Sequence, residues 1–230
     1  VQDVLEKLED ISTKDGYVGL TAFVIKATGD LLRENPRLNA RLFHGWFSVE
    51  VVTYNHVSCT TVVARKNDEG EEILLPLVIR DVDKLSIKEI QAKLSHYKNT
   101  PLSELQKETD ITKQKSMPGW MVRLAHFKFR SDPHFTEAKI GSSYGVSSIV
   151  HKNSGGRSGH TPSVQTSFFP TNIQERVVPY KGEIAIRKVL SFCMVVDHYV
   201  VDGMDIMRAV QALGDKIPSV DYLMAKLDQG

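Results

Sequence analysis

The spacing of apolar residues along the chain predicts five helices. Apolar side chains recur at helical intervals from Leu20 to Leu31, and Pro36 disfavours the helical conformation in the residue before it, so this helix should end just before Pro36. Ser86 and Glu89 have the spacing of a capping box, which indicates where another helix begins. The predicted helices cover residues 1–8, 20–35, 86–97 and 120–129 and the residues that follow Gly203.

Stretches rich in apolar and β-branched residues predict strands between these helices. Residues 47–53 and 57–65 are predicted to form a hairpin that turns near Asn55, and residues 66–70 form a polar turn. Further strands are predicted at residues 73–82, 141–149 and 183–196. Because helices and strands are mixed rather than strictly alternating, the pattern indicates an α+β fold and argues against a doubly wound nucleotide-binding fold.

Composition limits the class of protein. A chain of 230 residues, 41% apolar and 25% charged, can bury the core of one large domain, expected to span residues 1–230. The net charge of +1 gives no reason to expect a nucleic acid or a charged membrane surface as a partner, and no apolar run approaches the roughly 18 to 20 residues of a membrane span. Cys59 and Cys193 are interpreted as buried, reduced thiols, which favours the cytoplasm, or the mitochondrial matrix in a eukaryote.

The best candidate for chemistry lies near the C-terminus. An apolar run at residues 189–196 predicts a buried strand that leads to His198, and Gly203 then allows a sharp turn into a helix. A rigid strand end suits a catalytic base, which must keep its angle to a substrate. Asp202 follows the histidine at a fixed interval. On this pattern alone, a structural histidine beside an aspartate remains the alternative to a catalytic one.

The segment from Asp197 to Gly203 resembles the HxxxDG signature of the dihydrolipoamide acyltransferases of 2-oxoacid dehydrogenase complexes and of chloramphenicol acetyltransferase. Asp197, directly before the histidine, favours the former, whereas Tyr199 stands where that family usually has arginine. Residues 20–40 and 75–87 are similar to two other segments of the family. The resemblance implies a chloramphenicol acetyltransferase-like two-layer sandwich, with a mixed sheet and packed helices.

The resemblance also implies roles for particular residues. Residues 141–149 are similar to the strand that carries the family's active-site hydroxyl, which places that hydroxyl on Ser147. Ser148 would take the role if the register slipped by one residue, and it is also a candidate to contact coenzyme A. Arg157, in the glycine-rich stretch at residues 155–159, is a weaker candidate for the phosphates of coenzyme A. That stretch lacks the ending of a nucleotide-binding P-loop and is interpreted as a hairpin tip.

The activity that the resemblance implies is acyl transfer between coenzyme A and a dihydrolipoyl-type thiol, with the lipoyl group carried on another domain or protein. His198 would be the general base, Ser147 would stabilise the oxyanion, and Asp202 would hold the turn that orients the histidine. No metal is expected, because the other histidines show no compact ligand spacing. These are His44, His56, His96, His126, His134, His151 and His160.

The resemblance further implies a homotrimer whose active sites lie between subunits, with a lipoyl-domain protein and dehydrogenase-complex subunits as possible partners. The polar ending at residues 225–230 favours a simple trimer over a larger core. Compared with the family, the chain is expected to lack an N-terminal edge segment, including the arginine that holds the motif aspartate, so Asp202 would need another partner. No lipoyl domain is expected in these residues.

Two alternative functions remain open. A chloramphenicol-type enzyme would use the same base on an alcohol. A structural relative would keep the assembly but would not catalyse the reaction, and Tyr199 and the missing arginine are the reasons to consider it.

Residues 117–124 have no counterpart that the resemblance can place. We expect them to pack against the domain, with a lid or a substrate-side wall as the alternative, and Trp46 and Trp120 are interpreted as packing residues.

Overall fold

The computed structural model describes residues 1–14, 16–45, 47–66, 70–101, 104–105, 118–148, 150 and 165–230. The strands are β1 (Ala40–His44), β2 (Val49–Thr53), β3 (Cys59–Lys66), β4 (Glu72–Ile79), β5 (Tyr144–Val146), β6 (Thr166–Tyr180) and β7 (Glu183–Val195). The α-helices are α1 (Gln2–Lys14), α2 (Leu20–Glu34), α3 (Ile87–Asn99), α5 (Gly119–Ser131), α6 (Pro133–Ile140), α7 (Gly203–Lys216) and α8 (Val220–Lys226). Two 3₁₀ turns are η1 (Pro36–Asn39) and η2 (Val82–Lys84).

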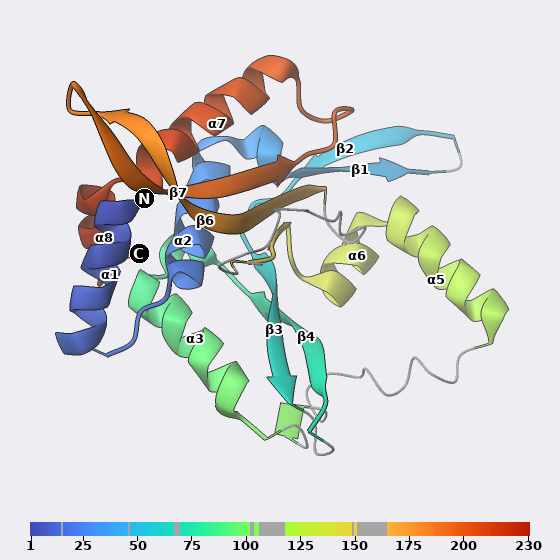
Figure 1. The fold of residues 1–230 in the computed structure, drawn as a ribbon. Coiled ribbons are helices and arrows are strands. Elements are labelled where there is room, and N and C mark those ends of the chain that lie inside the picture. The colour runs from blue at the N-terminus through green and yellow to red at the C-terminus, as the bar shows by residue number, and fades with distance from the viewer. Residues whose placement is uncertain are drawn as a thin grey trace.

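The main sheet is mixed and has the strand order β4-β3-β5-β6-β7 (Figure 1). β5 runs parallel to both of its neighbours, whereas β3 pairs antiparallel with β4 and β6 pairs antiparallel with β7. β6 and β7 form a long hairpin whose register shifts between Pro170 and Asn172. A mixed sheet with packed helices confirms the predicted α+β class.

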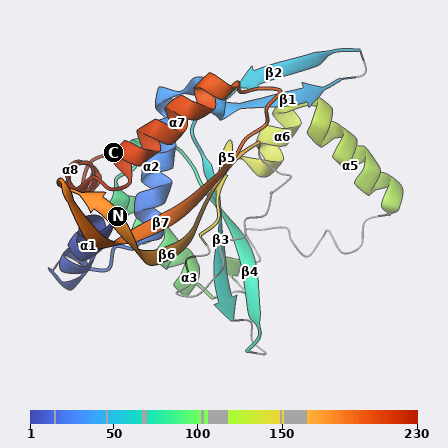
Figure 2. The same cartoon turned by 45° about the horizontal axis from the view of Figure 1, so that its top comes forward.

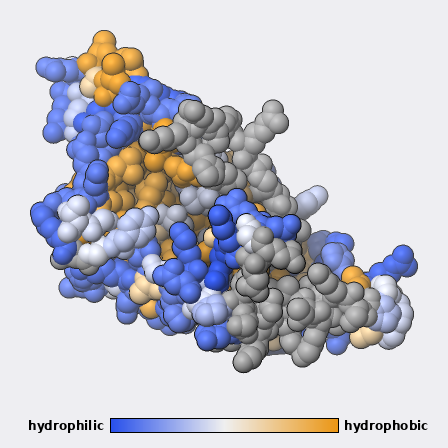
Figure 3. All heavy atoms as spheres, turned by 60° about the horizontal axis from the view of Figure 1, so that its bottom comes forward, coloured by the Kyte–Doolittle hydropathy of each residue, from blue (hydrophilic) through white to orange (hydrophobic). Residues whose placement is uncertain are grey.

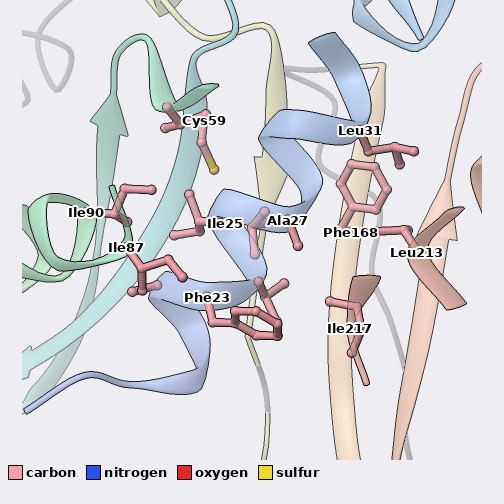
Figure 4. Packing of buried hydrophobic residues seen from close by; sticks show 14 of the residues in the cluster. Phe23, Ile25, Ala27, Leu31, Cys59, Ile87, Ile90, Phe168, Leu213 and Ile217 are labelled. Atoms are coloured by element: carbon pink, nitrogen blue, oxygen red, sulfur yellow. The ribbon is translucent and has the colours of Figure 1, made fainter. Parts of the chain in front are cut away.

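Helix α2 is the centre of the hydrophobic core. Its buried residues run without interruption from Ala22 to Leu32. Figure 4 shows side chains of α2 between Ile87 and Ile90 of α3 on one side and Phe168 of β6 and Leu213 of α7 on the other. Each large apolar side chain buried in this way contributes about 1.5 to 3 kcal/mol to folding.

A buried ion pair ties α2 to the C-terminal part of the chain. Lys26, fully buried, lies 3.0 Å from Asp30 and donates a hydrogen bond of 2.7 Å to the carbonyl oxygen of Asp83. The Tyr222 hydroxyl of α8 donates a hydrogen bond of 2.7 Å to the carboxylate of Asp30. Burial lowers the pKa of Lys26, and the hydrogen bond that Lys26 donates to the Asp30 carboxylate acts in the opposite direction. The network therefore satisfies a charge that would otherwise be costly inside the core.

The predicted hairpin at residues 47–65 is wrong. β2 pairs with β1, and β3 pairs with β4. The chain crosses between the two sheets after β2, where the Asn39 side-chain amide donates to the carbonyl oxygens of Tyr54 and His56 at 3.0 and 2.8 Å. Apolar periodicity identifies a strand but not its partner, and β1, β6, α6 and α8 had not been predicted.

Several other boundaries agree with the sequence analysis. α2 ends at Glu34, and Ser86 and Glu89 form both hydrogen bonds of a capping box at the start of α3. The strand predicted at residues 73–82 ends earlier, at Ile79, because Asp81 takes a left-handed conformation (φ 49°) and η2 follows. None of the described helices is long and apolar enough to cross a membrane.

The surface is mostly hydrophilic on the face drawn in Figure 3, and hydrophobic residues gather there in patches. Helix α5 contradicts the expected packing of residues 117–124, because none of its residues is buried and Trp120 is 67% exposed. The helix lies at one side of the molecule, away from α1 and α8 (Figures 1 and 2). The predictions for Trp46, for the polar turn at residues 67–69 and for the glycine-rich stretch with Arg157 lie outside the described residues.

Candidate active site

His198 lies in the loop between β7 and α7, on a turn that Asp197 closes. The carbonyl oxygen of Asp197 accepts hydrogen bonds from the backbone amides of Val200 and Val201 at 3.0 and 3.1 Å. Its carboxylate accepts another from the amide of Tyr199 at 2.9 Å. Aspartate is suited to such turns because its short side chain reaches its own backbone. The His198 side chain is exposed, and among the described residues its ring has no hydrogen-bond partner.

Gln165 anchors this turn to the rest of the domain. Its amide nitrogen donates to the Asp197 carboxylate at 3.0 Å, and its amide oxygen accepts from the backbone amide of Leu42 in β1 at 2.5 Å. The next residue, Thr166, donates from its hydroxyl to the carbonyl oxygen of Leu38 at 2.7 Å. The loop that carries His198 is thus held by the start of β6 and, through it, by β1.

Asp202 begins helix α7 and is bound on two sides. Its Oδ1 accepts hydrogen bonds from the amides of Met204 and Asp205, both at 2.9 Å, which satisfies free donors at the helix N-terminus. Its Oδ2 lies 3.4 Å from Arg37 of η1, which also pairs with Asp205 at 3.0 Å. The backbone hydrogen bond from Asp205 is the main reason that the pKa of Asp202 is lowered.

Arg37 is therefore the other partner that Asp202 was expected to need. Both side chains are largely exposed, so the ion pair itself adds little stability. Its effect is geometric: it links η1, which follows α2, to the first turn of α7, directly after the histidine loop.

Ser147 directly follows β5, which is shorter than the strand predicted at residues 141–149. Its backbone amide donates to the carbonyl oxygen of Phe168 at 3.0 Å, and its side chain is half-buried, as is that of Ser148. β5 is anchored in the core by Tyr144, whose hydroxyl donates to the carbonyl oxygen of Ile25 in α2 at 2.9 Å. Burial raises the pKa of Tyr144 well above its usual value, so this residue is a structural hydroxyl.

β6 separates Ser147 from the histidine loop. Val146 of β5 pairs with Phe168, and Val195 of β7 pairs with Ser167 on the other side of the same strand. Strands two apart are separated by about 10 Å, which exceeds hydrogen-bond reach between their backbones. Within one chain, Asp202 therefore lies close to the histidine loop. Among the described residues, no hydrogen bond joins Ser147 to His198.

Two site residues were missed from the sequence. Arg37 lies just after the predicted end of the helix at Pro36, and Gln165 lies in a segment to which no element had been assigned. The only signal in the sequence that pointed to Arg37 was that Asp202 needs a positively charged partner, and many other basic residues could have been that partner. Among the described residues, no group of three or more histidine, cysteine or acidic side chains is placed to hold a metal ion.

The family model for the 2-oxoacid dehydrogenases acyltransferase (catalytic domain) matches residues 1–115, which is half of the chain. The chain belongs to this family. The resemblance noted in the sequence is thereby confirmed, and the chain is an acyltransferase catalytic domain. Comparison with curated proteins gives no match.

Solved structures of similar fold support the same architecture for this acyltransferase domain. A probable dihydrolipoamide acetyltransferase from Listeria monocytogenes is 20% identical, with a TM-score of 0.61 over 94% of this chain and 79% of its own. The cubic core of the pyruvate dehydrogenase multienzyme complex is 18% identical, with a TM-score of 0.63 over 97% and 80%. The dihydrolipoamide acetyltransferase of Azotobacter vinelandii is also 18% identical, with a TM-score of 0.64 over 97% and 80%. These similarities confirm the predicted fold.

Proposed function

We propose that this domain transfers an acyl group between coenzyme A and a dihydrolipoyl-type thiol, with His198 as general base. The observation that carries this is residue spacing. The Azotobacter structure was solved to study the role of a serine, a histidine and an asparagine in catalysis, and these follow one another at intervals of 52 and 4 residues. Ser147, His198 and Asp202 follow one another at 51 and 4, with an aspartate in the third position.

His198 would accept the proton of the attacking thiol. A thiol with a pKa of about 8.5 is mostly protonated at neutral pH, and an imidazole with a pKa of about 6.5 can remove the proton as sulfur attacks the thioester carbon. The tetrahedral intermediate then expels the second sulfur, which takes the proton back from the imidazolium. A hydroxyl that donates to the oxyanion, the role proposed for Ser147, is worth about 3 kcal/mol in the barrier.

The loop geometry suits this role for His198. The side chain is exposed and therefore accessible, while Asp197 and Asp202 fix the backbone on either side of it through hydrogen bonds. Asp202 is occupied by the helix start and by Arg37, which supports an architectural role rather than that of an acid acting on the imidazole. Ser148, half-buried beside Ser147, stays a candidate contact for coenzyme A.

We further propose that the site is completed by a second copy of the chain in a homotrimer. Within one chain β6 lies between Ser147 and the histidine loop, which supports a site in which a neighbouring copy supplies the complementary residue. Exposed apolar side chains lie directly after the histidine and would be covered by that copy. They are Tyr199 in the loop and Met204, Met207 and Val210 on α7. The proposed natural acceptor is a dihydrolipoyl group carried on another domain or protein of a dehydrogenase complex.

The test is thiol release from acetyl-coenzyme A with dihydrolipoamide as acceptor. We expect acceptor-dependent release by the wild type, its loss in His198→Ala, and unchanged release in the control His126→Ala, which alters an exposed histidine on α5. Release with chloramphenicol in place of dihydrolipoamide would instead assign an alcohol acceptor. Binding of coenzyme A without transfer to either would show a structural relative.

A mixing experiment tests the shared site. Inactive His198→Ala and Ser147→Ala chains are unfolded together, refolded and assayed. Partial recovery of release is expected, because some interfaces then combine an intact histidine with an intact serine from the other chain. No recovery at any mixing ratio, with the trimeric mass preserved, would refute a site built from two copies.

A further inference from the structure

Gln165 and Asp197 lie opposite each other where the ladder between β6 and β7 ends. The last pair of this ladder joins Ser167 to Val195, and one further step along both strands places Gln165 across from Asp197. This step lies outside the backbone ladder, because β6 begins at Thr166 and β7 ends at Val195. A side-chain contact takes its place: the Gln165 amide nitrogen donates to the Asp197 carboxylate at 3.0 Å.

The two neighbours of the Gln165 amide fix its orientation. Its oxygen accepts from the backbone amide of Leu42 in β1, which can only donate, and its nitrogen faces the carboxylate of Asp197, which accepts. Turning the amide by half a rotation would place donor against donor and acceptor against acceptor. At neutral pH a glutamate of the same length could not form both bonds, because an ionised carboxylate has no donor.

Asp197 transmits this contact to the histidine. Its Oδ2 is held by Gln165, and its Oδ1 accepts from the backbone amide of Tyr199 at 2.9 Å. His198 lies between these two residues of the turn, and its ring has no hydrogen-bond partner among the described residues. The backbone of the turn therefore sets the direction of the ring. Figures 1 and 2 show the connection from β7 to α7 beside β1 and β2.

The far end of the histidine loop has an anchor of its own. Asp202 accepts from the backbone amides of Met204 and Asp205 and lies 3.4 Å from Arg37. This anchor holds the start of α7, whereas Gln165 acts on the residue directly before the histidine. Loss of the Gln165 contact should therefore loosen the turn and leave the start of α7 in place.

We infer that Gln165 is a positioning residue for acyl transfer, which holds the turn so that the His198 ring faces the attacking thiol. This inference rests on the proposed function of His198 as general base. A displacement of a catalytic group by about 1 Å can slow a reaction about a hundredfold. Gln165 acts through Asp197 rather than on a substrate, so loss of the contact should lower kcat and leave KM nearly unchanged.

An exchange of donor and acceptor tests the contact. In Gln165→Glu two carboxylates face each other, and in Asp197→Asn one oxygen remains for two donors. Each single variant should lower kcat at least about tenfold and change KM for acetyl-coenzyme A less than about twofold. In the double variant Gln165→Glu/Asp197→Asn the introduced amide donates to the introduced carboxylate, so every bond of the turn can form again. Its kcat should return to within about threefold of the wild type.

Amide hydrogen exchange measures the order of the loop without reference to activity. Gln165→Glu should speed exchange at least about tenfold at residues 199–201, whose amides donate to Asp197, and the double variant should restore the wild-type rates. Residues 204 and 205, whose amides donate to Asp202, should exchange as in the wild type. The matched control is Gln174→Glu, at an exposed glutamine of β6, which should leave both kcat and exchange unchanged.

Wild-type kcat in Gln165→Glu, or unchanged exchange at residues 199–201, would overturn the inference. A loss that the double variant does not recover, at the oligomeric mass of the wild type by light scattering, would also overturn it, because the pair with Asp197 would not be the cause. Asp197→Asn provides the same test if Gln165→Glu does not fold. A wild type that transfers no acyl group would instead refute the proposed function, and hydrogen exchange would still show whether Gln165 orders the histidine loop.

Discussion

Helices α2 and α5 have similar apolar patterns in the sequence but opposite environments in the structure. α2 is buried from Ala22 to Leu32, whereas α5 has no buried residue. The difference lies in the neighbours: α2 lies among the sheet, α3 and α7, while α5 contacts mainly α6 and β1. Apolar periodicity thus shows that a helix forms, and the surrounding elements decide whether its apolar residues are buried in the core or exposed.

Polar residues show the same contrast. In α2 the buried Lys26 and Thr28 are satisfied by hydrogen bonds, the latter to the carbonyl oxygens of Val24 and Ile25. In α5 the basic side chains extend into solvent. A buried helix requires partners for every polar group, and an exposed helix does not.

The largest expected effect is that of Phe23→Ala in α2. Phe23 is fully buried and contacts Tyr222 edge-on, so its removal leaves a cavity and should lower the free energy of unfolding by about 4 kcal/mol. Urea unfolding followed by circular dichroism measures it. The matched change on α5, Phe127→Ala, should cost less than about 1 kcal/mol, and equal losses would abolish the distinction between the two helices.

The next effect is that of Asp30→Ala. It leaves the buried ammonium of Lys26 without its carboxylate, and removing one partner of a buried ion pair costs about 3 kcal/mol. Asp215→Ala, at an exposed aspartate near the end of α7, should change the free energy of unfolding by less than about 0.5 kcal/mol. Both variants are compared by urea unfolding at neutral pH. A similar small change in Asp30→Ala would mean that Lys26 is not held in the core as described.

Ala125→Gly on α5 should cost about 1 kcal/mol, because glycine is a poor helix former. Since few contacts connect α5 to the core, the loss should appear locally, as faster amide hydrogen exchange within residues 119–131, with little change in global unfolding. A loss of the same size in global stability would indicate that α5 unfolds together with the core.

The smallest effect is that of Leu124→Ala. The side chain is 51% exposed, so the free energy of unfolding should change by less than about 0.5 kcal/mol. A loss above about 2 kcal/mol would show that Leu124 is packed, and it would contradict the exposure of α5.

Features with local causes could be predicted from the sequence. Pro36 and the Ser86–Glu89 capping box act on backbone only a few residues away, so the end of α2 and the start of α3 were correct. The strand and helix around His198 also form where they were predicted, as β7 and α7. The prediction that the strand is buried was wrong, because residues 189–195 of β7 are only partly buried. The spacing of the candidate site residues is likewise a property of the chain alone.

Tertiary structure decided which segments meet. The strands of the wrongly predicted hairpin each pair elsewhere, because alternation specifies which face of a strand is buried but not its neighbour. Arg37 and Asp202 are 165 residues apart in sequence, and only folding of α2 against α7 brings them together. The sequence by itself therefore determined the family, the helices and the candidate chemistry. Strand pairing, the anchoring of the histidine loop by Gln165 and the exposure of α5 depend on long-range packing, which no local pattern encodes.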